Sequence, residues 1–393
     1  MTSRPAQAAP QPAPDPQDDA PRTTSARAVA AAGGGCGGES PHLFSSPLIP
    51  AGVSYGRALV DPGNASFLVR TVAWVRDHGG GPLVDVVENL YYGLKTPPDT
   101  PGPGRPAKAR PAPASAATQP APLATLTGSA ALPGEGVRQA AAPVTGSTPG
   151  VYTTFIRPDA NHASVIAGVA RFDQNIVATR VVPGIKEPSG LGWPEGGTVP
   201  TALRAGLVTT FNSGWKMKDA HGGFLADRRT AVALRDGAAS AVIDRSGRGS
   251  IGRWGRDLTN GPDVVAVRQN LALIIDNGQV VPGLEVNSGN SWGSACNQLQ
   301  YTWRSGLGTD TQGNLIYVGG NKMTLSSLAA ALSQAGAVTA MELDIHGGMV
   351  DLSTYTHDTT GQPAGTPLLP TMPGSPARYL VPDQRDFFAV TAR

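Results

Sequence analysis

Two stretches rich in Pro, Ala, Gly and Ser limit most strongly what this chain can fold into. The first covers residues 1–55 and the second covers residues 96–147. Neither stretch carries enough apolar side chains to offset the conformational entropy that a chain loses when it folds. We therefore predict that residues 1–55 are disordered and that residues 96–147 form a semi-rigid Pro/Ala-rich linker. Packed structure is then confined to residues 56–95 and 148–393.

Residues 56–95 show the apolar spacing of a pair of short amphipathic helices. Gly79–Gly81 separate the two helices, and Pro82 is suited to the first turn of the second one. The sequence leaves two interpretations open: a helical hairpin that packs on the main domain, or an element that contacts a membrane surface with few basic residues to assist it. The apolar positions are Phe67, Leu68, Val72 and Val75 in the first helix and Leu83, Val86, Val87 and Leu90 in the second.

Composition excludes several classes of protein. The chain has 393 residues, a formal net charge of +2 and only 15% charged residues, so we predict no nucleic-acid partner. No apolar run reaches the ~20 residues that span a bilayer, and the N-terminal residues lack the apolar core of a signal peptide. Cys36 and Cys296 are too few for a thiolate metal site, and a disulfide between them stays open.

Residues 148–393 are predicted to form an α+β domain that is mostly antiparallel sheet with few helices. Short β-rich runs such as "VYTTFI" and "DVVAVRQN" are separated by turn signals such as "RDG" and "DNG". One helix is clear at residues 325–335, where Thr324 can serve as the N-cap and Gly336 can end the helix. The mixture of many strands and few helices is typical of the α+β class.

The strand predicted after this helix ends in "AMELDIHGG" and carries two carboxylates where apolar residues are expected. Alternation places Met341, Leu343 and Ile345 on one face of the strand and Glu342, Asp344 and His346 on the other. Two carboxylates about 7 Å apart on one face influence each other's pKa, which suits one acid and one base. The alternative is that Glu342 and Asp344 face solvent on a half-exposed strand.

Several of these motifs resemble those of the phosphodiester glycosidase domain family, in a divergent actinobacterial-type branch. "WRSGLG", with Arg304, is similar to the family's "RTAIG" strand, and "MTLSSL" is similar to its "T-L-x-x-L" helix. "AMELDIHGG" is similar to the family's "A-L-x-L-D-G-G-G-S" strand end and places Asp344 on the family's aspartate. "LRAGLVTTFNSGW" is similar to its "A-x-N-G-G-F" stretch. The resemblance covers roughly residues 200–393 and extends more weakly to residue 151.

The resemblance implies a hydrolase that cleaves the glycosidic bond of a sugar-1-phosphodiester in a cell-envelope or exopolysaccharide glycan. Arg304 would clamp the phosphate, because a guanidinium matches its oxygens in a bidentate fork. Asp344 and Glu342 would activate water or stabilise an oxocarbenium-like centre. The two "HGG" stretches, 221–223 and 346–348, are expected to converge on the same pocket. The predicted substrate-binding residues are Asn212, Gly214, His221, Arg268, Gln269, Asn270, His346 and Gly347.

No cofactor is predicted, and no metal-ligand spacing is present, although a calcium ion held by Asp and backbone oxygens is left open. The predicted partner is an anionic glycan or glycosyl phosphodiester, with membrane contact as a weaker alternative and the oligomeric state unknown. The localisation is unknown from the residues alone, and the resemblance suggests the cell envelope or the extracellular space. Two alternatives remain open: a non-catalytic carbohydrate-binding or envelope-polymer-binding domain, and a purely structural envelope protein.

Overall fold

The computed structural model describes residues 48–61, 66–94, 96–99, 120–141, 149–188, 192–287, 289–293 and 298–393. Residues 50–393 form one compact unit, and nearly all of the other unit, residues 1–49, lies outside the described residues. Both cysteines, the predicted disordered tail up to residue 47 and half of the predicted linker also lie outside them. None of the described helices is long and apolar enough to cross a membrane.

The period-two runs of residues 139–393 form three sheets in which all described strand pairs are antiparallel. The large sheet contains, in spatial order, β1 (Gln139–Ala140), β2 (Val151–Ile156), β3 (Ala167–Phe172), β14 (Leu315–Met323), β13 (Thr302–Thr309), β15 (Thr339–Ile345), β11 (Leu273–Asp276) and β12 (Gln279–Val280). The predicted fold class, mostly antiparallel sheet with few helices, is confirmed.

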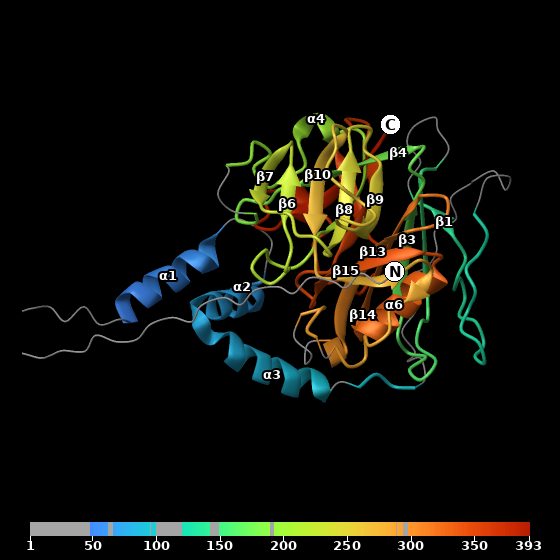
Figure 1. Cartoon of the computed structure of the whole chain (residues 1–393), viewed down its shortest axis with the longest axis horizontal. Helices are drawn as coiled ribbons and strands as arrows, with labels where there is room; N and C mark the ends of the chain where they lie inside the picture. Colours follow the sequence, from blue (N-terminus) through green and yellow to red (C-terminus); the bar gives the residue numbers. More distant parts are fainter. Residues whose placement is uncertain are drawn as a thin grey trace, which may run out of the picture. The chain divides into compact units, whose positions relative to one another are not determined.

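Two smaller sheets stand beside the large one (Figure 1). The β5 sheet has the order β17 (Pro363–Pro367), β16 (Leu352–His357), β5 (Leu207–Asn212), β18 (Phe387–Ala392) and β4 (Val177–Val182). The β10 sheet has the order β7 (Arg229–Val232), β6 (Phe224–Ala226), β10 (Val264–Gln269), β8 (Ala239–Asp244) and β9 (Gly249–Arg253). The helices within this region are α4 (Thr201–Arg204), α6 (Leu325–Gln334) and the 3₁₀ turn Arg378–Leu380.

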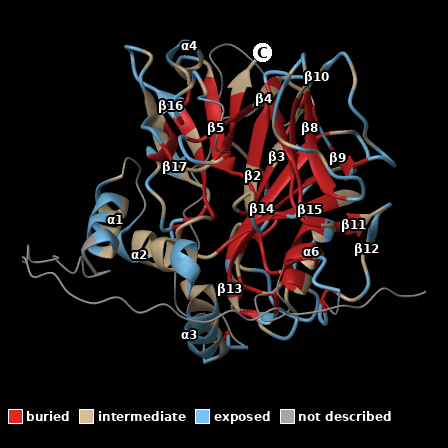
Figure 2. Ribbon diagram, turned by 60° about the vertical axis from the view of Figure 1, so that its left-hand side comes forward, coloured by how far each residue is buried: buried red, intermediate tan, exposed pale blue. Residues whose placement is uncertain are grey.

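Two apolar cores hold these sheets together, and Figure 2 shows the buried residues concentrated in the strands and in α6. The first core joins all three sheets through side chains such as Phe172, Phe211 and Phe224. The second lies between the large sheet and α6, where Leu328 and Leu332 are fully buried. Because apolar contact area drives folding, strands that end between these cores are held rigidly at their ends.

Three helices precede the sheets: α1 (Leu48–Val60), α2 (Phe67–Val75) and α3 (Gly81–Gly93). The chain turns between α2 and α3 through residues 76–80, where Gly79 has a φ of +86° that glycine adopts without strain. Ser66 caps α2, because its hydroxyl accepts a hydrogen bond from Val69 N. The predicted helical pair at residues 56–95 is therefore present as α2 and α3.

Two predicted boundaries differ from the structure. Helix α1 begins at Leu48, inside the segment predicted to be disordered up to residue 55. Residues 120–141 pack on the large sheet, although they fall in the linker predicted for residues 96–147: β1 pairs with β2, and Glu135 forms a buried ion pair with Arg157 at 2.9 Å. Composition alone did not reveal this contact, because the low-complexity pattern of the linker continues up to β1.

Candidate active site

β15 reaches the centre of the large sheet from the end of helix α6. Thr324 caps α6, because its hydroxyl accepts a hydrogen bond from Ser327 N at 3.2 Å and Ser327 Oγ accepts one from Thr324 N at 2.9 Å. The helix stops before Gly336, which has a φ of +100°. β15 then runs between β13 and β11. The sequence predicted both the capped helix and the strand that follows it.

A β-bulge in β15 separates Glu342 from Asp344. Along β13, Arg304 pairs with Ile345 and Gly306 pairs with Glu342, so a step of two residues on β13 corresponds to a step of three on β15. An extra residue of this kind interrupts the alternation of side chains, so the side chains after it point in a different direction. Glu342 and Asp344 consequently have different neighbours, although they lie two residues apart.

Because of the bulge, the side chains of β15 do not all lie on the faces predicted from simple alternation. Met341 and Leu343 pack in the core between the sheets, as predicted, but Ile345 packs in the core beneath α6. Both sides of β15 are therefore interior, and the alternative of a half-exposed strand is also wrong. The side chains assigned to one face were Met341, Leu343 and Ile345, and those assigned to the other were Glu342, Asp344 and His346.

Asp344 lies at the boundary between the interior and the surface. Its side chain is 10% exposed, and its Oδ2 accepts a hydrogen bond from Arg385 Nη2 at 3.0 Å. Its Oδ1 accepts another from Ile345 N at 2.8 Å. Burial raises the pKa of Asp344 from its ordinary 3.8 to about 6, and the neighbouring Arg385 charge limits the rise. A carboxyl group with this pKa can exchange protons near neutral pH.

Arg385 is a candidate site residue that the sequence analysis missed. It lies in the loop before β18, its side chain is 12% exposed, and its Nη2 also donates to Gly214 O at 2.6 Å. Burial alone would lower the pKa of Arg385, but Asp344 and Asp386 outweigh it and raise that pKa. Its Nε is buried and has no hydrogen-bond partner among the described residues. No motif marks this arginine, because its place beside Asp344 depends on pairing between distant strands.

The loop of residues 212–215, after β5, forms one wall beside the Asp344–Arg385 pair. Asn212 bridges neighbouring elements, because its Nδ2 donates to Ser305 Oγ at 2.9 Å and its Oδ1 accepts from Tyr317 at 2.9 Å. At Gly214 a Cβ atom would lie 2.7 Å from Asn270 Oδ1, so only glycine fits. Ser213 Oγ is buried without a hydrogen-bond partner among the described residues, and buried polar groups of this kind often await a ligand.

Arg268, Gln269 and Asn270 hold this wall in place. Arg268 forms a buried ion pair with Asp386 at 2.8 Å, and Gln269 Oε1 accepts from Gly223 N at 2.8 Å. Asn270 Nδ2 donates to the carbonyl groups of residues 342 and 343, both at 2.9 Å. All three side chains are at least 99% buried. The structure thus gives the predicted substrate-binding residues at positions 268–270 interior contacts, and contact with a substrate there remains a prediction.

Arg304 and Glu342 form an ion pair in the dry interior. Their side chains are fully buried, and Arg304 Nη1 lies 2.8 Å from Glu342 Oε1. Arg304 also donates to Gln298 Oε1 at 2.7 Å and to Met323 O at 2.8 Å. Burial raises the pKa of Glu342 and lowers that of Arg304. The structure thus gives Arg304 interior contacts, and its role as a phosphate clamp remains a prediction.

The "HGG" stretch after β15 lies against the N-terminal helices. His346 has a φ of +75°, and its Nε2 lies 3.5 Å from Glu88 Oε2 of α3. Burial lowers the pKa of His346 to about 3, so the imidazole is neutral near pH 7. A Cβ atom at Gly347 would lie 3.2 Å from the Trp303 ring, and one at Gly348 would lie 2.5 Å from Val69 of α2. These glycines let the chain turn closely beneath the helices.

His221, in the other "HGG" stretch, is exposed and has a φ of +49°. Gly222 of that stretch packs against Gln269, where an added Cβ atom would meet Gln269 Cβ at 2.5 Å. Among the described residues no recorded hydrogen bond or ion pair joins His221 to Asp344 or His346. The structure therefore gives no support to the expected convergence of the two stretches, and a binding role for His221 remains a prediction.

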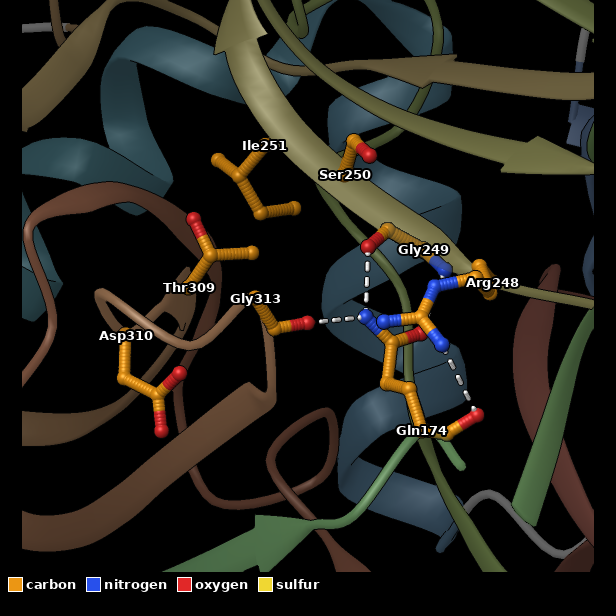
Figure 3. A pocket seen from close by; sticks show the side chains of 8 residues that line it. All are labelled: Gln174, Arg248, Gly249, Ser250, Ile251, Thr309, Asp310 and Gly313. Atoms are coloured by element: carbon orange, nitrogen blue, oxygen red, sulfur yellow. Dashed lines mark hydrogen bonds between the residues drawn. The ribbon is translucent and has the colours of Figure 1, made fainter. Parts of the chain in front are cut away.

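A separate hollow of about 280 Å³ lies at the opposite end of β13 from Arg304 (Figure 3). Gln174 Nε2 donates to Gly249 O at 2.8 Å and to Gly313 O at 2.6 Å, and Arg248 donates to Asn175 at 3.0 Å. Because these polar groups bond to one another, the hollow offers few free groups to a ligand. It contains none of the predicted site residues.

The described residues contain no cluster of three or more His, Cys, Asp or Glu side chains that could hold a metal ion. Asp344 faces a guanidinium, and the other acids near it are paired with arginines: Asp386 with Arg268, and Glu342 with Arg304. The arrangement around Asp344 is therefore that of a carboxylate beside a cation, which suits an anionic substrate.

Comparison with known proteins supports the resemblance found in the sequence. Residues 198–358 match the family model described as phosphodiester glycosidase. No curated protein matches the chain. Among solved structures, the chain is similar to the catalytic domain of zebrafish N-acetylglucosamine-1-phosphodiester alpha-N-acetylglucosaminidase, auto-inhibited by its pro-peptide. The identity is 16%, the TM-score is 0.41, and the match covers 65% of this chain and 87% of that one. A hypothetical protein from Synechocystis is similar at 14% identity and a TM-score of 0.36, with 63% of each chain covered.

The matched range contains the loop after β5, the Arg304–Glu342 pair and Asp344, and it ends before Arg385. It begins shortly before α4 and closes with β16, so it includes the β10 sheet and the central strands of the large sheet. The predicted resemblance is confirmed on this range: residues 198–358 match the phosphodiester glycosidase family model.

Proposed function

We propose that this protein is a hydrolase that cleaves the glycosidic bond of a sugar-1-phosphodiester in a cell-envelope or exopolysaccharide glycan. Water adds to the anomeric carbon, the bond between that carbon and the phosphate oxygen breaks, and the phosphate leaves as a monoester on the other partner. A phosphomonoester needs little protonation to leave, so the reaction depends mainly on stabilising charge and on activating water.

One observation carries the proposal: Asp344 and Arg385 meet at 3.0 Å at the edge of the interior, and both side chains are slightly exposed. Arg385 Nε and Ser213 Oγ are buried beside this pair with no partner among the described residues. Unpaired polar groups of this kind are costly unless something occupies the site at times. A phosphate oxygen is suited to Arg385, and a sugar hydroxyl is suited to Ser213.

In this proposal Asp344 acts in its ionised form. It accepts a proton from the attacking water or stabilises positive charge that develops at the anomeric carbon. Arg385 holds the phosphate and keeps Asp344 partly ionised near neutral pH. Arg304 and Glu342 fix the end of β15 from the interior, so they position Asp344 without touching the substrate.

The proposal is tested by incubating the purified full chain with a panel of glycosyl phosphodiesters and measuring sugar release and phosphate release separately. We expect release of the free sugar, with the phosphate retained as a monoester. Binding of these ligands without release of either product would instead favour the alternative, a non-catalytic carbohydrate-binding domain on the same scaffold. Release of inorganic phosphate would indicate a different reaction and would contradict the proposal.

The pH dependence follows from the pKa of Asp344. Because the ionised form is the active one, kcat/KM should fall about tenfold per pH unit below a pKa of about 6. Arg385 lowers the pKa of Asp344, so Arg385→Gln should move this limb to higher pH. The measurement is kcat/KM over about pH 4 to 8, a range that brackets the titration of Asp344. A limb that stays in place in the Arg385→Gln variant would contradict the assignment.

The role of Arg385 in binding gives a second prediction. Arg385→Lys keeps the charge but loses the planar fork, so we expect kcat/KM to fall about 100-fold. The matched control is Arg248→Lys, which changes the same group in the hollow near β9 and should leave kcat/KM unchanged. Equal losses in the two variants would show that the effect is not specific to Asp344 and its surroundings.

A further inference from the structure

Helix α3 carries an apolar face that the described part of the chain leaves exposed. The face consists of residues spaced by three and four along the helix, which places them on one side. Each of these side chains is more than half exposed, and Figure 2 shows α3 largely in the colour of exposed residues. We call this face the α3 stripe: Leu83 (66%), Val86 (65%), Val87 (57%) and Leu90 (68%) of α3, and Leu94 (80%), which directly follows the helix.

The acidic side of α3 is the one that contacts the protein's own residues. Asp85 and Glu88 pair with Arg76 at 2.8 and 2.7 Å, and Glu88 also lies 3.5 Å from His346 after β15. An amphipathic helix in an isolated globular protein normally buries its apolar face and exposes its charged face. α3 does the reverse, so its apolar face is suited to a partner beyond the described residues.

The turn before α3 anchors the helical pair by charge as well. Asp77 lies 3.0 Å from Lys216 Nζ and 2.8 Å from Lys218 Nζ, in the loop that follows β5. At the start of α2, Phe67 and Leu68 are also 66% and 69% exposed. The contacts that hold α2 and α3 thus combine ion pairs with the packing of Val69 on Gly348, whereas the surfaces they turn outward are apolar.

We propose that the α3 stripe is a dimer interface, at which two copies of this chain pack α3 against α3. Leu83, Val87, Leu90 and Leu94 follow the 4-3-4 spacing of the apolar seam between paired helices. The stripe contains no charged residue, so two identical copies meet without repulsion. The five side chains of the α3 stripe offer on the order of 500 Å² per copy, hence about 1,000 Å² across a symmetric pair. Specific protein interfaces begin at about this area.

A lipid surface fits the same helices less well. Helices that lie on membranes depend on Lys and Arg side chains to attract lipid headgroups. Residues 66–94 carry two basic residues, Arg70 and Arg76, against three acidic ones, Asp77, Asp85 and Glu88. Arg76 is already paired with two of these acids, so little positive charge remains for headgroups. A second copy of the chain is the occupant that the charges favour.

The first test measures the mass of the full chain by sedimentation velocity over a wide range of concentrations. We expect the wild-type chain to have the mass of two chains at high concentration and the Leu83→Lys/Leu90→Lys variant to remain a single chain. Val280→Lys/Val286→Lys is the matched control, because both valines are exposed but lie outside the helices, and this variant should dimerise like the wild type. A wild-type chain that stays single at every concentration overturns the proposal.

A mixing experiment identifies the partner directly. The Leu83→Glu/Leu90→Glu variant should also be a single chain, and mixing it with the Leu83→Lys/Leu90→Lys variant should restore the mass of two chains, because opposite charges then meet across the pair. Circular dichroism confirms that each variant is folded. If mixing does not restore the mass of two chains, the proposal is overturned. It is also overturned if the wild type stays a single chain and floats with phosphatidylcholine vesicles while the lysine variant does not, because the stripe then binds lipid.

Discussion

Asp344→Asn is expected to reduce kcat/KM on a glycosyl phosphodiester by about 1,000-fold. The amide keeps the shape of the side chain but can neither accept a proton from water nor stabilise positive charge as a carboxylate does. The measurement is the initial rate of sugar release by the full chain at saturating and limiting substrate. Asp310→Asn is the matched control, because Asp310 is an acid in the separate hollow, and this variant should keep its activity.

The same variant should fold at least as well as the wild type. The pKa of Asp344 is raised from 3.8 to about 6, so its ionised form is less stable in the folded protein than in the unfolded chain. Its contribution to stability is full below pH 3.8 and is lost as the pH rises through about 6. Asn has no ionised form, so the thermal midpoint at neutral pH should not fall. If Asp344→Asn is both inactive and unfolded, its loss of activity is explained by the loss of folding. Asp344→Glu retains the charge, so its activity then decides the role of the carboxylate.

The second large effect concerns stability rather than catalysis. Glu342→Leu should lower the free energy of unfolding by about 3–5 kcal/mol, because it leaves the fully buried Arg304 charge without its partner. Arginine does not release its proton in proteins, so this cost cannot be avoided. Arg304→Met should cost less, since the pKa of Glu342 is already raised and the carboxyl group can take up a proton.

Urea unfolding of the two single variants and of Arg304→Met/Glu342→Leu measures these costs. The double variant should recover most of the stability, because a buried ion pair and a pair of apolar side chains of similar volume are often equivalent. Additive losses in the three variants would mean that Arg304 and Glu342 are not coupled. A double variant of normal stability that has lost sugar release would mean that Arg304 contacts the substrate, contrary to its place in the interior.

The alternative of a binding domain depends on the same side chains. A domain that has lost catalysis would still hold an anionic glycan through Arg385 and the loop of residues 212–215, and Asp344→Asn would then leave ligand affinity nearly unchanged. The enzyme proposal requires a large fall in kcat/KM upon this substitution. Affinity and turnover measured on the same variant therefore separate the two functions.

The local sequence predicted the elements that carry the site. Thr324 and Gly336 mark the two ends of α6 because caps depend on a hydroxyl group or on glycine at one position. The motif around Asp344 indicated the resemblance to the family, because residues close in sequence at a strand end keep a recognisable spacing. Local chemistry of this kind is readable without knowledge of distant contacts.

By itself the sequence determined the fold class and the resemblance of residues 198–358 to the phosphodiester glycosidase family, and it predicted a site at the strand that ends at Asp344. Only the tertiary structure decided how the charged groups are paired. The bulge between β13 and β15 turned Ile345 toward α6 and left Glu342 with Arg304 in the interior, and the pairing of β18 with β5 brought Arg385 to Asp344. The physical reason is that strand register is set by packing across the whole sheet, which no short stretch of residues specifies.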